Sequence, residues 1–138
     1  MTTNSKQVAG DHYKTPGIQH WDMIHNNDIG YLAGNATKYL TRFRRKSGLQ
    51  DLEKALHYVE KMIESYSKFI ARSCGDVPPL ELETFFADNN IVGAERTPIR
   101  LILNWSDISD LNLARTWVEI LIAEYEGSSA GSNYVHQD

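Results

Sequence analysis

The sequence lacks most of the residues and motifs that commonly identify a reaction. It contains one cysteine, Cys74, which excludes an intrachain disulfide and a cysteine-based zinc cage and fits a reducing compartment. The patterns GxxxxGKS/T and GxGxxG are missing, which excludes a P-loop and a Rossmann dinucleotide site. HExxH is missing as well, and the five histidines do not cluster, so we expect no metal ligand set. Any bound phosphate must therefore be held by side chains on helices and loops.

Long apolar runs and an excess of positive charge are also missing. No stretch is apolar for long enough to span a bilayer, and no charged-then-apolar leader opens the chain, so we expect a cytoplasmic protein with no membrane contact. The net charge of -4 makes nucleic acid an unlikely partner, because such binding depends on many phosphate contacts. With 138 residues, 41% of them hydrophobic, the chain is long enough for one domain with a buried core.

Apolar residues recur every three or four positions in the long segments, which predicts an all-α fold with no sheet. We expect helices at about 18–27, 31–46, 49–73 and 80–88. Residues 98–105 fit a strand or a buried helix, and Pro98 in the first turn favours the helix. The last helix is predicted to be capped by Ser106 or Ser109 and to end near Tyr125. The short connection at Gly48 predicts an antiparallel helical hairpin as the core, with additional C-terminal helices.

The densest basic cluster lies at the joint of this hairpin and contains Lys38, Arg42, Arg44, Arg45 and Lys46. Lys38, Arg42 and Arg45 are spaced by three or four residues, so on a continuous helix they share one strip with Asn35. Two interpretations remain open. The strip is either a solvated face favoured by the helix dipole, or an anion site in which arginine grips a planar oxyanion with two bonds.

Three sequence blocks in residues 8–64 resemble a small phage family of formerly unknown function whose studied member is a phage-encoded nucleotide kinase. The blocks are AGDHYK, PGIQHWDMI and GNATKYLTRFRRKSGLQDLEKALHY. The family pattern reads GGDHYK, then P-I-Q-P-W-D, then GN-x-x-KY-x-x-R-x-x-x-K-x-G-x-x-DL-x-KA-x-HY. The chain departs from this pattern in Ala9 for the first glycine, in an extra Gly17, and in His20 where proline is usual. None of these changes removes a functional group from the candidate site.

The resemblance implies phosphoryl transfer to a nucleoside or deoxynucleoside monophosphate without a P-loop. A nucleoside triphosphate would be the phosphate donor, and the need for magnesium stays open. Asp11 and His12 are then the candidate acid and base. The candidate substrate-binding and phosphate-binding residues are Tyr13, Lys14, Trp21, Asn35, Lys38, Tyr39, Arg42, Arg45, Lys46, Asp51, Lys54 and Tyr58. A protein that sequesters nucleotides or cyclic nucleotides without turnover would use the same cations and aromatic rings, so this alternative also stays open.

Plainer interpretations exist for several of these residues. The Asp11–Lys14 loop could be an ordinary turn, Asp51 could serve the helix dipole, and Tyr58 could be a margin of the core. We divide the chain into a flexible N-terminus (1–8), a nucleotide-binding helical hairpin region (9–73), a C-terminal helical region of the same domain (74–126) and a flexible tail (127–138). One hairpin cannot easily enclose two nucleotides, so we expect a homo-oligomer with shared sites, in the host cell cytoplasm.

Overall fold

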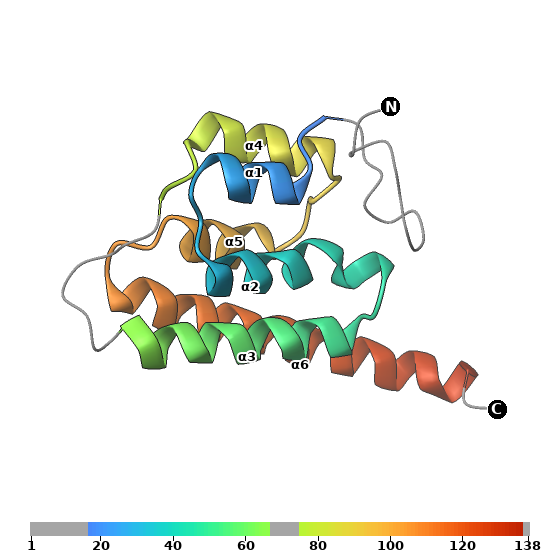
Figure 1. The fold of residues 1–138 in the computed structure, drawn as a ribbon. Coiled ribbons are helices and arrows are strands. Elements are labelled where there is room, and N and C mark those ends of the chain that lie inside the picture. The colour runs from blue at the N-terminus through green and yellow to red at the C-terminus, as the bar shows by residue number, and fades with distance from the viewer. Residues whose placement is uncertain (1–16, 67–74, 137–138) are drawn as a thin grey trace.

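The structure is a computed structural model that describes residues 17–66 and 75–136, with the backbone alone from residue 129 onward. These residues form helices and contain no strand, so the predicted all-α class is confirmed (Figure 1). The elements are α1 (His20–Asn26), α2 (Tyr31–Arg42), the 3-10 helix η2 (Phe43–Arg45), α3 (Leu49–Tyr66), α4 (Pro79–Asp88), α5 (Arg96–Leu103) and α6 (Ile108–His136). None of the described helices combines the length and the apolar content needed to cross a membrane.

The helices are arranged in three layers of two (Figure 1). α1 lies beside α4, α2 beside α5, and α3 beside α6. α2 and α3 run antiparallel and pack along their length, which confirms the predicted hairpin. The helix predicted at 98–105 is present as α5, so the choice of helix over strand was correct.

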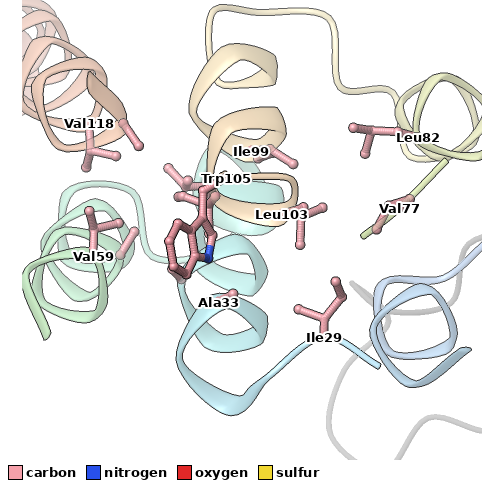
Figure 2. Packing of buried hydrophobic residues seen from close by; sticks show 14 of the residues in the cluster. Ile29, Ala33, Val59, Val77, Leu82, Ile99, Leu103, Trp105 and Val118 are labelled. Atoms are coloured by element: carbon pink, nitrogen blue, oxygen red, sulfur yellow. The ribbon is translucent and has the colours of Figure 1, made fainter. Parts of the chain in front are cut away.

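One hydrophobic core is shared by all six α-helices. Trp105, which follows α5, lies between Val59 of α3 and Ala33 of α2 (Figure 2). Met23 of α1 and Leu82 of α4 are buried in the same cluster. The hairpin helices and the helices that follow them therefore bury their apolar faces against each other.

The predicted continuous helix over 31–46 is wrong at its C-terminal end. The α-helix stops at Arg42, and Phe43–Arg45 tighten into a 3-10 turn. Gly48, which has a φ of +50°, then donates its backbone N–H to the carbonyl oxygen of Phe43 at 2.9 Å. A tighter last turn and a left-handed glycine are common ways to satisfy the final carbonyl groups of a helix.

Neither predicted serine caps α6. The backbone N–H of Ser109 donates to Asp107 Oδ1 at 2.8 Å, and the backbone N–H of Asp107 donates to Asp110 Oδ2 at 3.3 Å. Asp107 and Asp110 therefore form a reciprocal capping arrangement, in which each carboxylate satisfies a backbone donor that the helix leaves free.

The predicted end of the last helix near Tyr125 is wrong, because the backbone of residues 127–136, which were predicted as a flexible tail, continues α6. The last turns of this helix extend beyond the other helices (Figure 1). Adding residues to an existing helix carries no nucleation cost, and the segment contains no proline that would stop it. The predictions for the N-terminus and for residues 67–73 lie outside the described residues.

Candidate functional site

Tyr39 is the centre of a cluster of cationic and aromatic side chains where α2 packs on α3. The Lys38 ammonium nitrogen lies 4.7 Å from the centre of the Tyr39 ring, and the Arg42 guanidinium carbon lies 4.8 Å from it. Lys54 of α3 places its ammonium nitrogen 5.3 Å from the same point. All three distances are in the range in which a cation is attracted to an aromatic ring. Two helices therefore bring three positive charges around one ring.

The positive charge of Arg42 is paired with the carboxylate of Asp51. Arg42 Nε donates to Asp51 Oδ2 at 3.3 Å, and Arg42 Nη2 donates to Asp51 Oδ1 at 3.2 Å. Asp51 Oδ2 also accepts the backbone N–H of Ser47 at 3.1 Å. The Asp51 side chain is 0% exposed and that of Arg42 is 12% exposed. Asp51 thus holds Arg42 and the turn in place from inside the protein, and we assign it a positioning role.

The lysines of the cluster differ from Arg42 in this respect. Within the described parts of the chain, no carboxylate lies within ion-pair distance of Lys38 or Lys54. Their like charges repel each other across the Tyr39 ring, and this repulsion is weakened by a bound anion. These two ammonium groups are therefore the cations of the cluster best suited to hold a phosphate.

Aromatic rings extend the cluster along the hairpin. Tyr58 stacks on Tyr39 with the ring centres 6.0 Å apart and the planes at 22°. Tyr31 meets Tyr58 edge-on at 6.1 Å. A hydrogen bond with Tyr31, followed by burial, raises the pKa of Tyr58 above its ordinary value. A phenol is protonated at neutral pH even without this shift, so Tyr58 carries a hydrogen that it can donate.

An open hollow of about 510 Å³ lies beside this aromatic row and is lined by Tyr39, Gln50, Glu53, Lys54, His57 and Tyr58. Its volume is in the range of sites that take one small molecule. Sequence reasoning did not assign Gln50, Glu53 or His57 to the site. Their spacing of three and four residues on α3 is the signal that could have found them, because it places all three on one side of the helix with Lys54.

Three of the predicted ligands lie apart from the Tyr39 ring. Arg45 belongs to η2, and its Nη1 donates to the carbonyl oxygen of Asn89 at 3.5 Å. The predicted strip of Lys38, Arg42 and Arg45 is therefore interrupted, because it assumed a continuous α-helix. Lys46 is exposed in the turn after η2, and Trp21 is about half exposed on α1. The Asn35 amide nitrogen donates to the carbonyl oxygen of Tyr31, one turn earlier, at 2.9 Å.

The remaining predicted site residues, Asp11, His12, Tyr13 and Lys14, lie outside the described residues. Ile18, just before α1, is held against the end of α4. The backbone N–H of Ile18 donates to Asp88 Oδ2 at 2.9 Å, and the carbonyl oxygen of Ile18 accepts the Asn89 amide at 2.7 Å. Asn89 also accepts the hydrogen bond from Arg45, so η2 and the entry to α1 meet at the end of α4.

His20, which replaces a proline of the family pattern, ties α1 to α2. Its Nε2 lies 2.8 Å from Thr37 Oγ1, and the Thr37 hydroxyl donates to the carbonyl oxygen of Ala33 at 2.9 Å. Burial, and next the nearby charge of Lys38, lower the pKa of His20 to about 3. His20 is therefore neutral at physiological pH and acts as a structural contact beneath the cationic cluster.

The described residues hold no group of three or more His, Cys, Asp or Glu side chains that could bind a metal ion. The described residues define an all-α protein with a cationic and aromatic site on a helical hairpin.

Residues 7–60 match the model of a family described as a protein of unknown function (DUF3310). The match includes α1, α2 and the first part of α3, which contain the Tyr39 cluster, and it ends before α4. No curated protein and no solved structure matches the chain significantly. The description of the matching family names no activity, so a function has to be argued from the site.

Proposed function

We propose that this protein binds nucleotides at the Tyr39 cluster and transfers a phosphoryl group to a nucleoside monophosphate. The observation that carries this proposal is the meeting of Lys38, Arg42 and Lys54 at one tyrosine ring beside an open hollow. Cations of this kind bind phosphate oxygens, and the faces of Tyr39 and Tyr58 offer surfaces on which a base or sugar can rest.

In phosphoryl transfer the protein contributes mainly by positioning the two substrates and neutralising their charge, and it need not form a covalent bond to either. An oxygen of the acceptor phosphate forms a bond to the γ-phosphorus of a nucleoside triphosphate. The bond from that phosphorus to the β,γ-bridging oxygen breaks, and a nucleoside diphosphate leaves. Lys38 and Lys54 would bind the acceptor phosphate, and Arg42, fixed by Asp51, would keep the Tyr39 ring in place. Asp11 and His12 remain the candidate acid and base, as the family resemblance implies.

A sequestering protein is the second candidate. Binding without turnover needs cations and aromatic rings such as those around Tyr39, and it needs no acid or base. Such a protein would bind nucleotides or cyclic nucleotides and return them unchanged. Turnover is the measurement that separates the two candidates.

Binding is tested by calorimetric titration of the four deoxynucleoside monophosphates into the protein and its variants. Lys38→Gln and Lys54→Gln should each weaken binding by about one to two decades, because each removes a charge-assisted contact with phosphate. Lys61→Gln is the matched control, since Lys61 is also an exposed lysine of α3 and does not line the hollow. Equal binding by all three variants would place the phosphate elsewhere. Arg42 variants are less useful, because they also remove the ion-pair partner of the buried Asp51 carboxylate.

Turnover is tested by incubating the protein with a nucleoside triphosphate and each monophosphate, with and without magnesium, and resolving the products by anion exchange. Nucleoside diphosphates should accumulate, and Lys54→Gln should lower their rate of formation. Tight binding with no diphosphate under either condition would contradict the kinase and favour sequestration.

A further inference from the structure

We infer that Glu53 makes the hollow on α3 selective for nucleoside monophosphates over triphosphates. This inference rests on the proposed function, because it specifies which of the two substrates the hollow takes. It starts from the two charged side chains that line the hollow, the ammonium group of Lys54 at one edge and the carboxylate of Glu53 at the other.

Helical geometry places these charges at opposite edges. Glu53 and Lys54 are adjacent in sequence and therefore point 100° apart around α3. Lys54 is on the side that faces α2, since it contacts the Tyr39 ring, and it is one turn from Tyr58. Glu53 is on the side away from α2 and is one turn from His57. Because Lys54, Tyr58 and Glu53 all line the hollow, a ligand that places its phosphate on Lys54 and fills the hollow also meets Glu53 at the outer edge.

The net charge available to an anion is small. Asp51 already offsets Arg42, so Lys38 and Lys54 supply the attraction. Glu53 is exposed, lines the hollow, and has no ion-pair partner in the described parts of the chain. Its full negative charge therefore faces whatever occupies the outer edge.

Two kinds of ligand meet this edge differently. The sugar and base of a monophosphate present hydroxyl and N–H donors, and a carboxylate accepts hydrogen bonds from them. A triphosphate held by its terminal phosphate would instead place further phosphate charge between Lys54 and Glu53, where the carboxylate repels it. The hollow thus fits the acceptor of the proposed reaction, and the triphosphate donor has to approach from another direction.

The test compares Glu53→Gln with Glu60→Gln by calorimetry at low salt in EDTA, with the four deoxynucleoside monophosphates and the corresponding triphosphates as probes. Glu60 is the matched control, because it is an exposed glutamate two turns further along the same side of α3 and does not line the hollow. The wild-type protein should bind monophosphates more tightly. Glu53→Gln should raise the affinity for triphosphates by about threefold to tenfold and leave the affinity for monophosphates unchanged or lower. Glu60→Gln should change neither affinity.

The possible results distinguish a failure of this inference from a failure of the proposed function. Tighter binding of triphosphates by the wild type, or equal effects of the two glutamine variants, would overturn the role of Glu53. Nucleotide binding that Lys54→Gln weakens would leave the proposed function standing in that case. A protein that binds none of the eight nucleotides would refute both.

Discussion

The fully buried carboxylate of Asp51 reaches across the hairpin turn and takes two hydrogen bonds from the guanidinium of Arg42, at 3.3 and 3.2 Å. The pair joins the end of α2 to the first turn of α3, and it holds Arg42 against the Tyr39 ring. Arg42, which the sequence spacing predicts to bind a ligand, therefore also stabilises the hairpin turn.

Asp51→Ala should destabilise the protein by about 2–3 kcal/mol, because a largely buried guanidinium and the Ser47 N–H both lose their acceptor. Urea unfolding followed by circular dichroism measures the change. Glu53→Ala is the control on the same helix and should stay within about 0.5 kcal/mol of wild type, since its side chain is exposed. Similar midpoints for the two variants would show that the Arg42–Asp51 pair contributes little.

Gly48→Ala should destabilise by about 1–2 kcal/mol, because the residue has a φ of +50° and an added methyl group would meet the Tyr125 hydroxyl. Gly127→Ala should have the opposite sign and stabilise α6 by about 0.5–1 kcal/mol, because nothing surrounds this helical position. Thermal unfolding of both variants gives the comparison. Tyr125→Phe should recover part of the loss in Gly48→Ala, and no recovery would assign the whole cost to the backbone.

Stability should fall as the pH drops from 7 to 5, in part because of His20. Its pKa is about 3 in the folded protein and about 6.5 when unfolded, so between these values the unfolded state binds the extra proton. This contribution to stability is fully present above pH 6.5 and decreases by roughly 1–2 kcal/mol on going to pH 5. His20→Gln should flatten the pH profile of urea unfolding by this amount. His25→Gln, at an exposed position of the same helix, should leave the profile unchanged.

Asp107→Ala should cost about 1 kcal/mol, because it removes the acceptor for the Ser109 N–H at the start of α6. Ser109→Ala should have a much smaller effect, although the sequence alone made Ser109 a candidate cap. Chemical unfolding of the two variants decides between them, and a larger loss in Ser109→Ala would restore the serine as the capping residue.

Self-association is expected if the proposed function is correct, because the reaction needs two nucleotides and one helical hairpin cannot easily enclose both. We expect the second copy to bind the outer face of α6, where Leu113 and Ile120 are 49% and 40% exposed. Sedimentation velocity at micromolar concentration should show a species larger than the monomer. Leu113→Lys with Ile120→Lys should shift it toward monomer, whereas Leu80→Lys on α4 should not. A monomer in the wild-type protein would contradict this assembly.

The sequence by itself determined the helical class, the hairpin at Gly48 and the approximate limits of most described helices. These features follow from local causes: the spacing of apolar residues along each segment, and glycine or proline at the breaks. The same spacing placed Lys38, Arg42 and Tyr39 close together, because they are neighbours on one helix.

Only the tertiary structure decided which charges are available for a ligand. Arg42 meets Asp51 because the turn folds α3 back on α2, and Arg45 contacts Asn89 from the 3-10 turn that follows the end of the α-helix at Arg42. Packing of α3 on α2 brings Lys54 to the Tyr39 ring, and Glu53 and His57 line the hollow beside it. Such pairings depend on the distance between segments remote in sequence, and this distance is set by the shared core and not by local periodicity.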